Sequence, residues 1–448
     1  MRKYILTISV LFSMVLCTFG QDSAWSLEDC ISYAMENNIM IKQTQLNSSY
    51  NENILSQSKI NRLPNLNASS SYDISFGRSL DYTTYEYIDE RTNNVFAGLT
   101  SNATLFNGFQ QKNTIEKNEF NLMASIQNTE KIKNDISLNI AAAFLQILFS
   151  QELENVARNQ LDITAQQVER TQKMVDAGKV AMGNALEIQA QYAAEELNLV
   201  NAENQLIMAY LNLQLMLDLQ YDPEFQIVNP DLASPETSMI LGNVEEVFAS
   251  AEQIMPQVKS SEYSLKAAEE DLAIAKGGLY PNLGISANSY TRYSDQAIDY
   301  RPDADGSYTF AEQFDDNLSL GLGLDLRIPI FNRNQVKTQI ANARINIENS
   351  ELELQSTKND LYRSIQQAYV DATGALKKYN SSEKALISME ESFKYTEKKF
   401  EVGLVNTVDY NTSKNQLTMT QSELLQSKYD FIFKTKILNF YKGENITL

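Results

Sequence analysis

Few residues in this sequence are of the types that carry out covalent or metal chemistry. The 448 residues include no histidine and only two cysteines, Cys17 and Cys30. The common metal sites and nucleophilic triads are therefore excluded or unsupported, and no glycine-rich phosphate loop is present. Carboxylate pairs such as Glu269/Glu270 occur, but acids on helical faces are usually solvated. We therefore expect no catalytic residue, no metal site and no cofactor, and a protein that is not an enzyme.

Acidic side chains recur at two positions where a helix would begin after a glycine turn. Each turn has a glycine, then an asparagine, then an acid three residues further on: Gly178, Asn184 and Glu187 in "GKVAMGNALE", and Gly403, Asn406 and Asp409 in "GLVNTVD". In both, the asparagine can cap the returning helix while the acid reaches back to complete a capping box. We expect the first turn to be three residues longer. Capping alone can explain the acids, because the helix dipole favours negative charge in a first turn.

The stretches around these turns predict two very long helical hairpins. Residues 109–222 and 334–441 contain no proline, and each contains only two glycines. We place the turns near 178–184 and 403–406. Apolar residues recur at alternating steps of four and three in both, interrupted only by Asn204 in the first: Leu186, Ala190, Ala193, Leu197, Val200, Ile207 and Leu211, and then Ile365, Tyr369, Ala372, Leu376 and Tyr379. Such spacing favours helices packed along their length as a coiled coil, and an ordinary antiparallel hairpin is the alternative.

Four other segments alternate apolar and polar residues with a period of two. We predict strands at about 65–77, 92–106, 282–294 and 317–331. In the last, leucines at every second position from Leu318 to Leu326 alternate with polar residues and glycine. This pattern matches membrane-barrel strands around a wet lumen, and a soluble sheet with one buried face is the alternative. Four strands cannot close a barrel, so several copies of the chain would have to share one.

The segments that join the paired strands are polar, acidic and rich in tyrosine, which suits exposed loops. Four aromatic residues beside them are candidates for an interfacial belt: Tyr72, Phe76, Tyr290 and Tyr293.

The same order of elements occurs twice in the sequence, which indicates an internal repeat. The corner "PNL" occurs at Pro64 and again at Pro281, after helix-like segments that align without a gap. Later, "LFNGFQQK" aligns with "IFNRNQVK" in a shifted register, which indicates a longer loop in the second copy. We therefore divide the mature chain into a first repeat, 21–222, a linker, 223–242, and a second repeat, 243–448.

The N-terminus predicts export. Residues 1–20 read as a secretory signal peptide cleaved near Gly20, with lipid attachment at Cys17 as an alternative. Cleavage leaves Cys30 as the one cysteine, so no internal disulfide can form. No later apolar run is long enough for a membrane-spanning helix. The formal net charge of −20 argues against nucleic acid as a partner.

Taken together, this order of elements resembles the TolC-like outer-membrane efflux family. The resemblance covers the chain from about Ser26 to Lys442, and it is carried by "LEDCISYAMENN", its repeat "VEEVFASAEQIMP", the two "PNL" corners and "FEVGLVNTVDYN". It implies an α+β membrane protein: a homotrimer in which four strands per protomer build one transmembrane β-barrel, continued by a long α-helical coiled-coil barrel in the periplasm.

The resemblance also implies a function and partners. Such a protein is the passive exit duct of a tripartite efflux or type I secretion system, in contact with outer-membrane lipid, a periplasmic adaptor (membrane fusion protein) and an inner-membrane RND or ABC-type pump. The glycine turns would form the periplasmic tip where adaptors dock. Asp409 matches the family's acidic tip position, whereas Thr412 replaces a second acid found in some members. Pro64 and Pro281 would mark the helix-to-barrel corners. A periplasmic coiled-coil adaptor without a membrane barrel is the alternative function.

Overall fold

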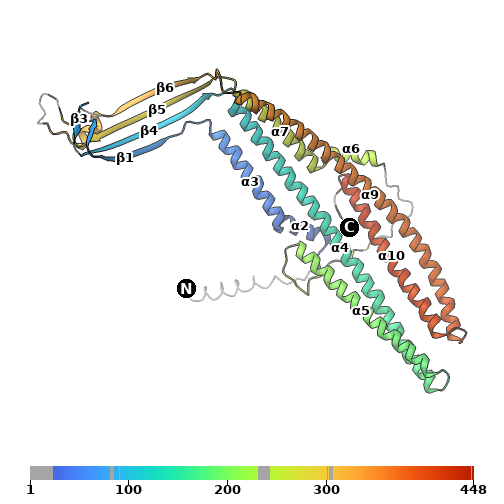
Figure 1. Cartoon of the computed structure of the whole chain (residues 1–448). Coiled ribbons are helices and arrows are strands. Elements are labelled where there is room, and N and C mark those ends of the chain that lie inside the picture. The colour runs from blue at the N-terminus through green and yellow to red at the C-terminus, as the bar shows by residue number, and fades with distance from the viewer. Residues whose placement is uncertain are drawn as a thin grey trace, which may run out of the picture. The chain divides into compact units, whose positions relative to one another are not determined.

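The computed structural model describes residues 24–80, 85–89, 91–230, 243–299, 301, 306–444 and 446–447. The predicted signal peptide, with Cys17, and most of the predicted linker lie outside these ranges. The described helices are α2 (Leu27–Asn37), α3 (Ile39–Ile60), α4 (Gln110–Asp176), α5 (Met182–Met216), α6 (Val244–Ile254), α7 (Pro256–Gly277), α8 (Phe310–Asp316), α9 (Gln335–Glu401) and α10 (Thr407–Tyr441) (Figure 1). The strands are β1 (Asn67–Ser75), β2 (Arg78–Leu80), β3 (Tyr87–Asp89), β4 (Thr92–Phe106), β5 (Asn282–Ser294) and β6 (Ser319–Arg327).

These elements form two compact units, and each unit draws on both halves of the sequence. The helical unit contains residues up to Leu46, Gln127–Lys259 and Ser356–Leu448, and the strand unit contains Asn47–Ile126 and Ser260–Gln355. The unit boundaries fall inside α3, α4, α7 and α9. The compact units therefore cut across the two predicted repeats.

Helices at matching places in the two halves have equal lengths. α2 and α6 have 11 residues each, and α3 and α7 have 22. The long helices α4 and α9 have 67 residues each, and the returning helices α5 and α10 have 35. The long helices begin after a strand and end at a glycine turn, as the absence of proline in these stretches indicates.

The strand unit contains a four-stranded antiparallel sheet in the order β1-β4-β5-β6. β4 and β5 have the bounds expected from the sequence, whereas β1 and β6 are shorter than expected at both ends. β2 and β3 form a separate two-stranded ribbon. The helix α8, in the segment between β5 and β6, was not expected from the sequence.

Cross-strand pairing gathers the alternating apolar residues on one side of the sheet, which we call the apolar face. Tyr72 lies opposite Val95, Ala103 opposite Ile285, and Leu283 opposite Leu326. Leu320, Leu322, Leu324 and Leu326 continue this face along β6 and are 62–86% exposed. The opposite side, the polar face, carries residues such as Asp73, Thr100, Asn102, Asn288 and Asp325.

Tyr290 does not share the face of the predicted belt residues Tyr72 and Tyr293, and Phe76, the fourth, follows the end of β1. It lies opposite Gly98 and Ser319, an odd number of positions from Tyr293. Its ring stacks on that of Phe96 with 6.0 Å between the centroids. Because neighbouring residues of a strand point to opposite sides, Tyr290 belongs to the polar face. Its expected place in the belt is therefore wrong, whereas Tyr72 and Tyr293 do lie on the apolar face.

Two glycines make a close backbone contact where β4 leads into α4. Gly108 has φ +65°, and a Cβ there would lie 2.3 Å from the carbonyl oxygen of Gly277, the last residue of α7. A side chain at Gly108 would therefore meet both an unfavourable backbone conformation and a backbone atom that cannot move aside.

We expect Gly108→Ala to destabilise the protein by more than about 2 kcal/mol, since strain and overlap add. Gly374→Ala is the matched control, because Gly374 lies inside α9 with no atom within 4 Å of an added Cβ. Alanine there should be neutral or gain up to about 1 kcal/mol. Thermal unfolding followed by circular dichroism measures both, and equal melting temperatures for the two variants would contradict the contact.

The hydrophobic core of the helical unit lies around the middle of α4. Ile140, Phe144, Ile147 and Leu148 are at most 1% exposed and pack with residues of α2, α5 and α10. By length and composition α4 contains a window apolar enough to span a membrane, but half of that window is buried inside the fold. We assign this window to a core helix.

Cys30 of α2 is part of this core and is 0% exposed. Burial raises the pKa of its thiol to about 12, and the neighbouring carboxylate of Asp29 adds to the rise. α2 begins with a capping box, in which Ser26 and Asp29 satisfy each other's backbone N–H groups. The cap fixes the start of α2, and Cys30 is buried on the same helix as Leu27 and Ala34.

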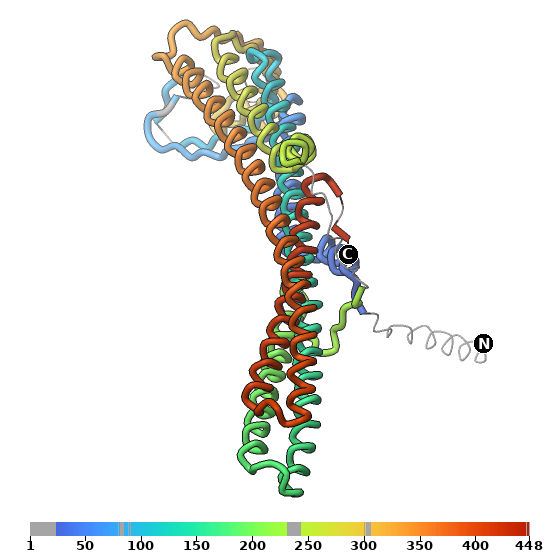
Figure 2. Tube along the Cα trace, turned by 90° about the vertical axis from the view of Figure 1, so that its right-hand side faces the viewer, coloured from blue at the N-terminus to red at the C-terminus, as the bar shows by residue number. Residues whose placement is uncertain are grey.

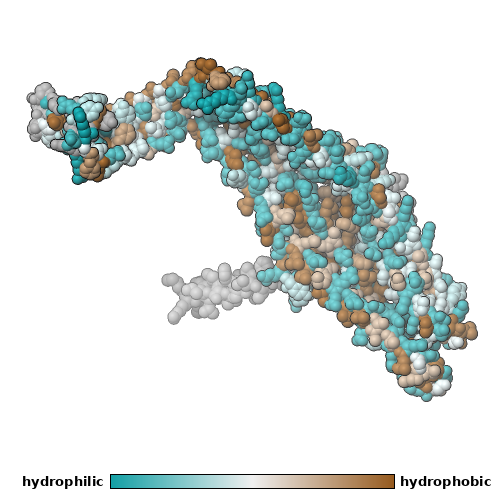
Figure 3. All heavy atoms as spheres, viewed as in Figure 1, coloured by the Kyte–Doolittle hydropathy of each residue, from teal (hydrophilic) through white to brown (hydrophobic). Residues whose placement is uncertain are grey.

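The two predicted apolar stripes, on α9 and α5, differ in how far they are buried within one chain. Ile365, Ala372 and Tyr379 of α9 are at most 4% exposed. By contrast, Leu186 and Leu197 of α5 are 55% and 61% exposed, and Val200 and Ile207 are also exposed. Apolar side chains reach the surface of the helical unit in several places (Figure 3). The α5 stripe has no packing partner within the described chain.

Candidate functional site

The two glycine turns lie at the same end of the helical unit, which we call the tip (Figures 1 and 2). Gly178 and Gly403 have φ of +65° and +77°. After each, a backbone N–H bonds the carbonyl five residues back, from Lys179 to Met174 at 2.9 Å and from Leu404 to Lys399 at 2.8 Å. This is a Schellman motif, which ends a helix and favours glycine at the left-handed position.

The turns are equal in length, so the expectation of a longer first turn is wrong. α4 ends at Asp176 and α5 begins at Met182, while α9 ends at Glu401 and α10 begins at Thr407. The extra residues of the first segment belong to the first turn of α5. Asn184 therefore lies inside α5, and the N-cap is Ala181, which makes no side-chain capping bond.

The second turn has the predicted cap. The Asn406 side chain accepts a hydrogen bond from the backbone N–H of Asp409 at 2.8 Å, which confirms Asn406 as the N-cap of α10. The reciprocal bond from the Asn406 backbone to the Asp409 carboxylate, which would complete a capping box, is not formed. The predicted box at Asn184 and Glu187 is wrong, because that helix starts two residues before Asn184.

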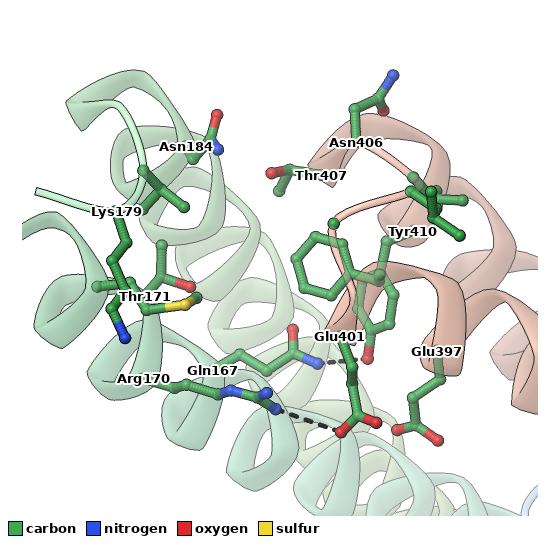
Figure 4. A pocket seen from close by; sticks show the side chains of 16 residues that line it. Gln167, Arg170, Thr171, Lys179, Asn184, Glu397, Glu401, Asn406, Thr407 and Tyr410 are labelled. Carbon is green, nitrogen blue, oxygen red and sulfur yellow. Dashed lines mark hydrogen bonds and ion pairs between the residues drawn. The ribbon is translucent and has the colours of Figure 1, made fainter.

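A groove of about 610 Å³ separates the tips of the two hairpins (Figure 4). One wall comes from α4 and the start of α5, and the other from α9, its turn and the start of α10. The lining residues that carry the argument are Gln167, Arg170, Glu401, Asn406 and Tyr410. All of them belong to the helical unit.

Tyr410 anchors this groove. Its side chain is 0% exposed, its ring stacks on Phe400 at 4.5 Å and lies 5.5 Å from Phe393. The Gln167 side-chain amide donates a hydrogen bond to the Tyr410 hydroxyl, and this bond joins the two hairpins (Figure 4). Burial raises the pKa of Tyr410, although the bond from Gln167 opposes the rise. The residue therefore remains neutral and packed near neutral pH.

An ion pair makes a second link across the groove. Arg170 of α4 lies 3.4 Å from a carboxylate oxygen of Glu401 at the end of α9. Both side chains are at least half exposed, so this pair contributes at most about 1 kcal/mol. The buried tyrosine, and not the ion pair, is the stronger of the two links.

A buried polar layer lies one turn further from the tip. Lys414 of α10 is 2% exposed and donates a hydrogen bond to the Thr164 hydroxyl of α4 at 2.8 Å. Glu195 of α5 is 3% exposed and accepts a bond from Gln191 at 2.6 Å. Burial lowers the pKa of Lys414 to about 8, although the charges of Glu195 and Glu397 favour the ammonium form.

This depressed pKa predicts that the hairpins become more stable as the pH rises from about 8 to about 10.5. Over that range the unfolded chain keeps the lysine proton and the folded chain has lost it, so folding no longer requires a buried charge. The full rise is on the order of 3 kcal/mol. Melting temperatures measured across this range should show the rise in the wild type and lose it in Lys414→Met.

Lys131→Met is the matched control, because Lys131 is 40% exposed on the same unit. That variant should keep the rise. A rise of the same size in Lys414→Met would assign the effect to another group.

The structure brings some of the predicted tip residues together and leaves others apart. Asn184, Gly403 and Asn406 line the groove, whereas Gly178, Glu187 and Asp409 do not. Glu187 and Asp409 are exposed. Pro64 and Pro281 belong to the strand unit, where they lie just before β1 and β5.

Sequence reasoning missed Tyr410, Gln167 and Lys414. Tyr410 and Lys414 are four residues apart and so share one face of α10, a signal that the sequence does contain. Gln167 has no comparable signal, since it is one of many polar residues on α4. Among the described residues, no group of three or more cysteine, aspartate or glutamate side chains is arranged to hold a metal ion.

Comparison with known proteins identifies the family. The sequence pattern of the outer membrane efflux protein family matches residues 30–218 and 247–432. The outer membrane protein TolC of Salmonella enteritidis is 22% identical over 381 residues, which cover 77% of this chain and 73% of TolC. The outer membrane efflux protein BepC of Brucella suis is 20% identical over 436 residues, 96% of this chain and 88% of BepC. The crystal structure of CusC superposes with a TM-score of 0.79 at 17% identity, over 96% of each chain.

Long helical hairpins joined to strands with one apolar face define a class, the outer-membrane channel with a periplasmic helical tunnel and a β-barrel. Within that class, the chain belongs to the outer membrane efflux protein family. Its location is the outer membrane, with the helical tunnel in the periplasm. The family is one of channels and not of enzymes, which favours the channel over the adaptor alternative.

Proposed function

We propose that this chain is one protomer of a homotrimeric exit duct. Three copies share one barrel in the outer membrane and one helical tunnel in the periplasm. The duct passively conducts substrates that an inner-membrane pump delivers through a periplasmic adaptor.

The observation that carries this proposal is the pair of open edges of the sheet. β1 pairs only with β4 and β6 only with β5, so each has one edge without a partner in the described chain. In lipid, unpaired backbone groups cost several kcal/mol each, and a spanning sheet must close. Because the strand directions alternate, β6 of one copy and β1 of the next run in opposite directions and can pair.

The number of chains in the assembly is inferred from the four strands that each chain supplies and from the resemblance to the TolC-like family. Membrane barrels begin at eight strands, so one chain is too few and either two or three copies would suffice. The resemblance to the TolC-like family favours three, which gives twelve strands. A dimer is therefore the specific competitor that an experiment must distinguish.

The helical unit supports the same assembly. Leu186, Leu197, Val200 and Ile207 form an exposed stripe on α5. Exposed apolar stripes at heptad spacing pack against another helix. In a closed tunnel, the next copy of the chain would supply that helix.

Equal helix lengths in the two halves support an internal duplication. Residues 21–222 and 243–448 would be the repeats, and 223–242 would be the linker. Each protomer then presents two similar hairpin ends at the tip, beside Asn184 and Glu187 in one and Asn406 and Asp409 in the other. We assign adaptor docking and closure of the aperture to these ends.

The test is the location and mass of the assembled protein. Extraction from the outer membrane in mild detergent, followed by light scattering, should give three times the mass of one mature chain. Insertion into planar bilayers should give discrete conductance steps. Twice the mass would overturn the trimer and leave a shared barrel, whereas a soluble monomer without channel activity would overturn the duct.

A further inference from the structure

The helix α8, between β5 and β6 in the sequence, packs on the end of β5 that is far from Pro281. α8 starts with a capping box in which Thr309 and Glu312 satisfy each other's backbone N–H groups. Gln313 is 1% exposed, accepts a bond from the Ser294 N–H at 2.9 Å, and donates to the carbonyls of Ser294 and Tyr308 at 3.0 and 2.8 Å. A fully bonded buried amide fixes α8 against the end of β5.

The contacts of α8 show which side of the sheet it covers. Ser289, Thr291 and Tyr293 occupy every second position of β5 and so point to the same side of the sheet. Ser289 lies opposite Leu320, which places all three on the apolar face. The Thr291 hydroxyl donates a hydrogen bond to the Phe314 carbonyl at 2.7 Å, and the Tyr293 ring lies 5.0 Å from that of Phe310. α8 therefore lies over the end of the face that carries the leucines.

α8 has one aromatic side and one charged side. Phe310 and Phe314, four residues apart, stack at 5.1 Å, and Phe310 is 50% exposed. On the other side, Arg301 lies 3.8 Å from Glu312 and 3.5 Å from Asp316, and it also pairs with Asp299. Aromatic rings next to a hydrated charged group favour the boundary between lipid headgroups and acyl chains.

The position along the strand places this boundary at the outer leaflet. β5 has 13 residues, which span about 40 Å at about 3.3 Å per residue, and about 30 Å along the normal at the usual barrel tilt. This is enough to cross the apolar band of an outer-membrane barrel, which is about 25 Å tall, and to reach the interface beyond it. Pro281 adjoins the periplasmic end, so α8 lies at the opposite one.

We infer that α8 is a lipid anchor, which places Phe310, Phe314 and Tyr293 in the headgroup boundary of the outer leaflet and fixes the height of the barrel in the membrane. This inference rests on the proposed function, because it requires the apolar face of the sheet to meet lipid. Its occupant is the lipid that already surrounds that face, since Thr291 and Tyr293, which contact α8, lie on the same side of the sheet as the exposed leucines of β6.

The experiment uses tryptophan as a depth probe. Trp25 is the one tryptophan of the chain, so Trp25→Phe gives a silent background for three single-tryptophan variants: Phe310→Trp, Leu322→Trp and Phe96→Trp. Each is reconstituted in phosphatidylcholine vesicles whose acyl chains carry bromine either near the headgroup or deep in the chain. Leu322→Trp reports the middle of the apolar face, and Phe96→Trp reports the polar face.

We expect the fluorescence of Phe310→Trp to be quenched more by shallow than by deep bromine, and only weakly by aqueous acrylamide. Leu322→Trp should be quenched most by deep bromine, and Phe96→Trp mainly by acrylamide. If acrylamide reaches Phe310→Trp as well as Phe96→Trp while Leu322→Trp still senses lipid, the anchor is overturned and the duct stands. If Leu322→Trp senses no lipid at all, the proposed function itself fails.

Discussion

Replacement of Leu322 by arginine should remove the protein from the outer membrane. Leu322 is 86% exposed in the middle of the apolar face. A guanidinium at the bilayer midplane of a barrel costs about 2–4 kcal/mol per protomer, and the cost multiplies with the number of copies. Immunoblots of membrane fractions should show degraded or soluble protein in place of an assembled outer-membrane species.

Thr100→Arg is the matched control, since it adds the same charge on the polar face. Thr100 is exposed and lies opposite Asn288. The residues that flank this pair across the sheet, Asn67 and Gly321, are polar or glycine. This variant should assemble normally, because its charge would face water in the lumen. If both variants lost assembled outer-membrane protein equally, the two faces of the sheet would not differ in environment. That result would contradict a barrel with lipid on one side and water on the other.

The second large effect is expected at Tyr410 in the groove at the tip. Tyr410→Ala removes a fully buried ring that contacts Phe393 and Phe400, which should cost about 3–5 kcal/mol. It also removes the bond to Gln167 that joins the two hairpins. We expect a lower melting temperature together with higher single-channel conductance in planar bilayers.

Tyr410→Phe separates packing from hydrogen bonding. It keeps the ring and loses only the hydroxyl, which should cost about 1 kcal/mol. If conductance is close to wild type in Tyr410→Phe and raised in Tyr410→Ala, packing of the Tyr410 ring holds the tip closed and its hydrogen bond does not. A lower melting temperature in Tyr410→Ala with unchanged conductance would show that this tyrosine stabilises the hairpins without holding the tip closed.

Much of the fold could be predicted because it depends on local patterns. The alternation from Leu318 to Leu326 requires a strand with one apolar face, and the pairing of Leu322 with Ala287 confirms that face. The long stretches without proline allow little besides helix. The side of Tyr290 was misjudged although the sequence contains the signal, because Tyr290 and Tyr293 are three positions apart in one strand and so point to opposite faces.

The site was predicted less well, since it depends on contacts between distant segments. Asn406 could be recognised as a cap from its neighbours alone, whereas Gln167 meets Tyr410 only after two hairpins have packed together. α8 was missed because its seven residues are mostly polar, and its position depends on the amide of Gln313. The first turn was misjudged because Ala181, the actual N-cap, has no capping side chain to mark it.

The burial of Cys30 has a consequence for export. A thiol with a pKa of about 12 is almost entirely protonated near neutral pH, and only the thiolate attacks disulfides. In the oxidising periplasm an exposed cysteine could form mixed disulfides with foldases or with a second copy of the chain. Once α2 has docked into the core, this route is closed, so redox conditions act on the newly translocated chain and not on the folded one.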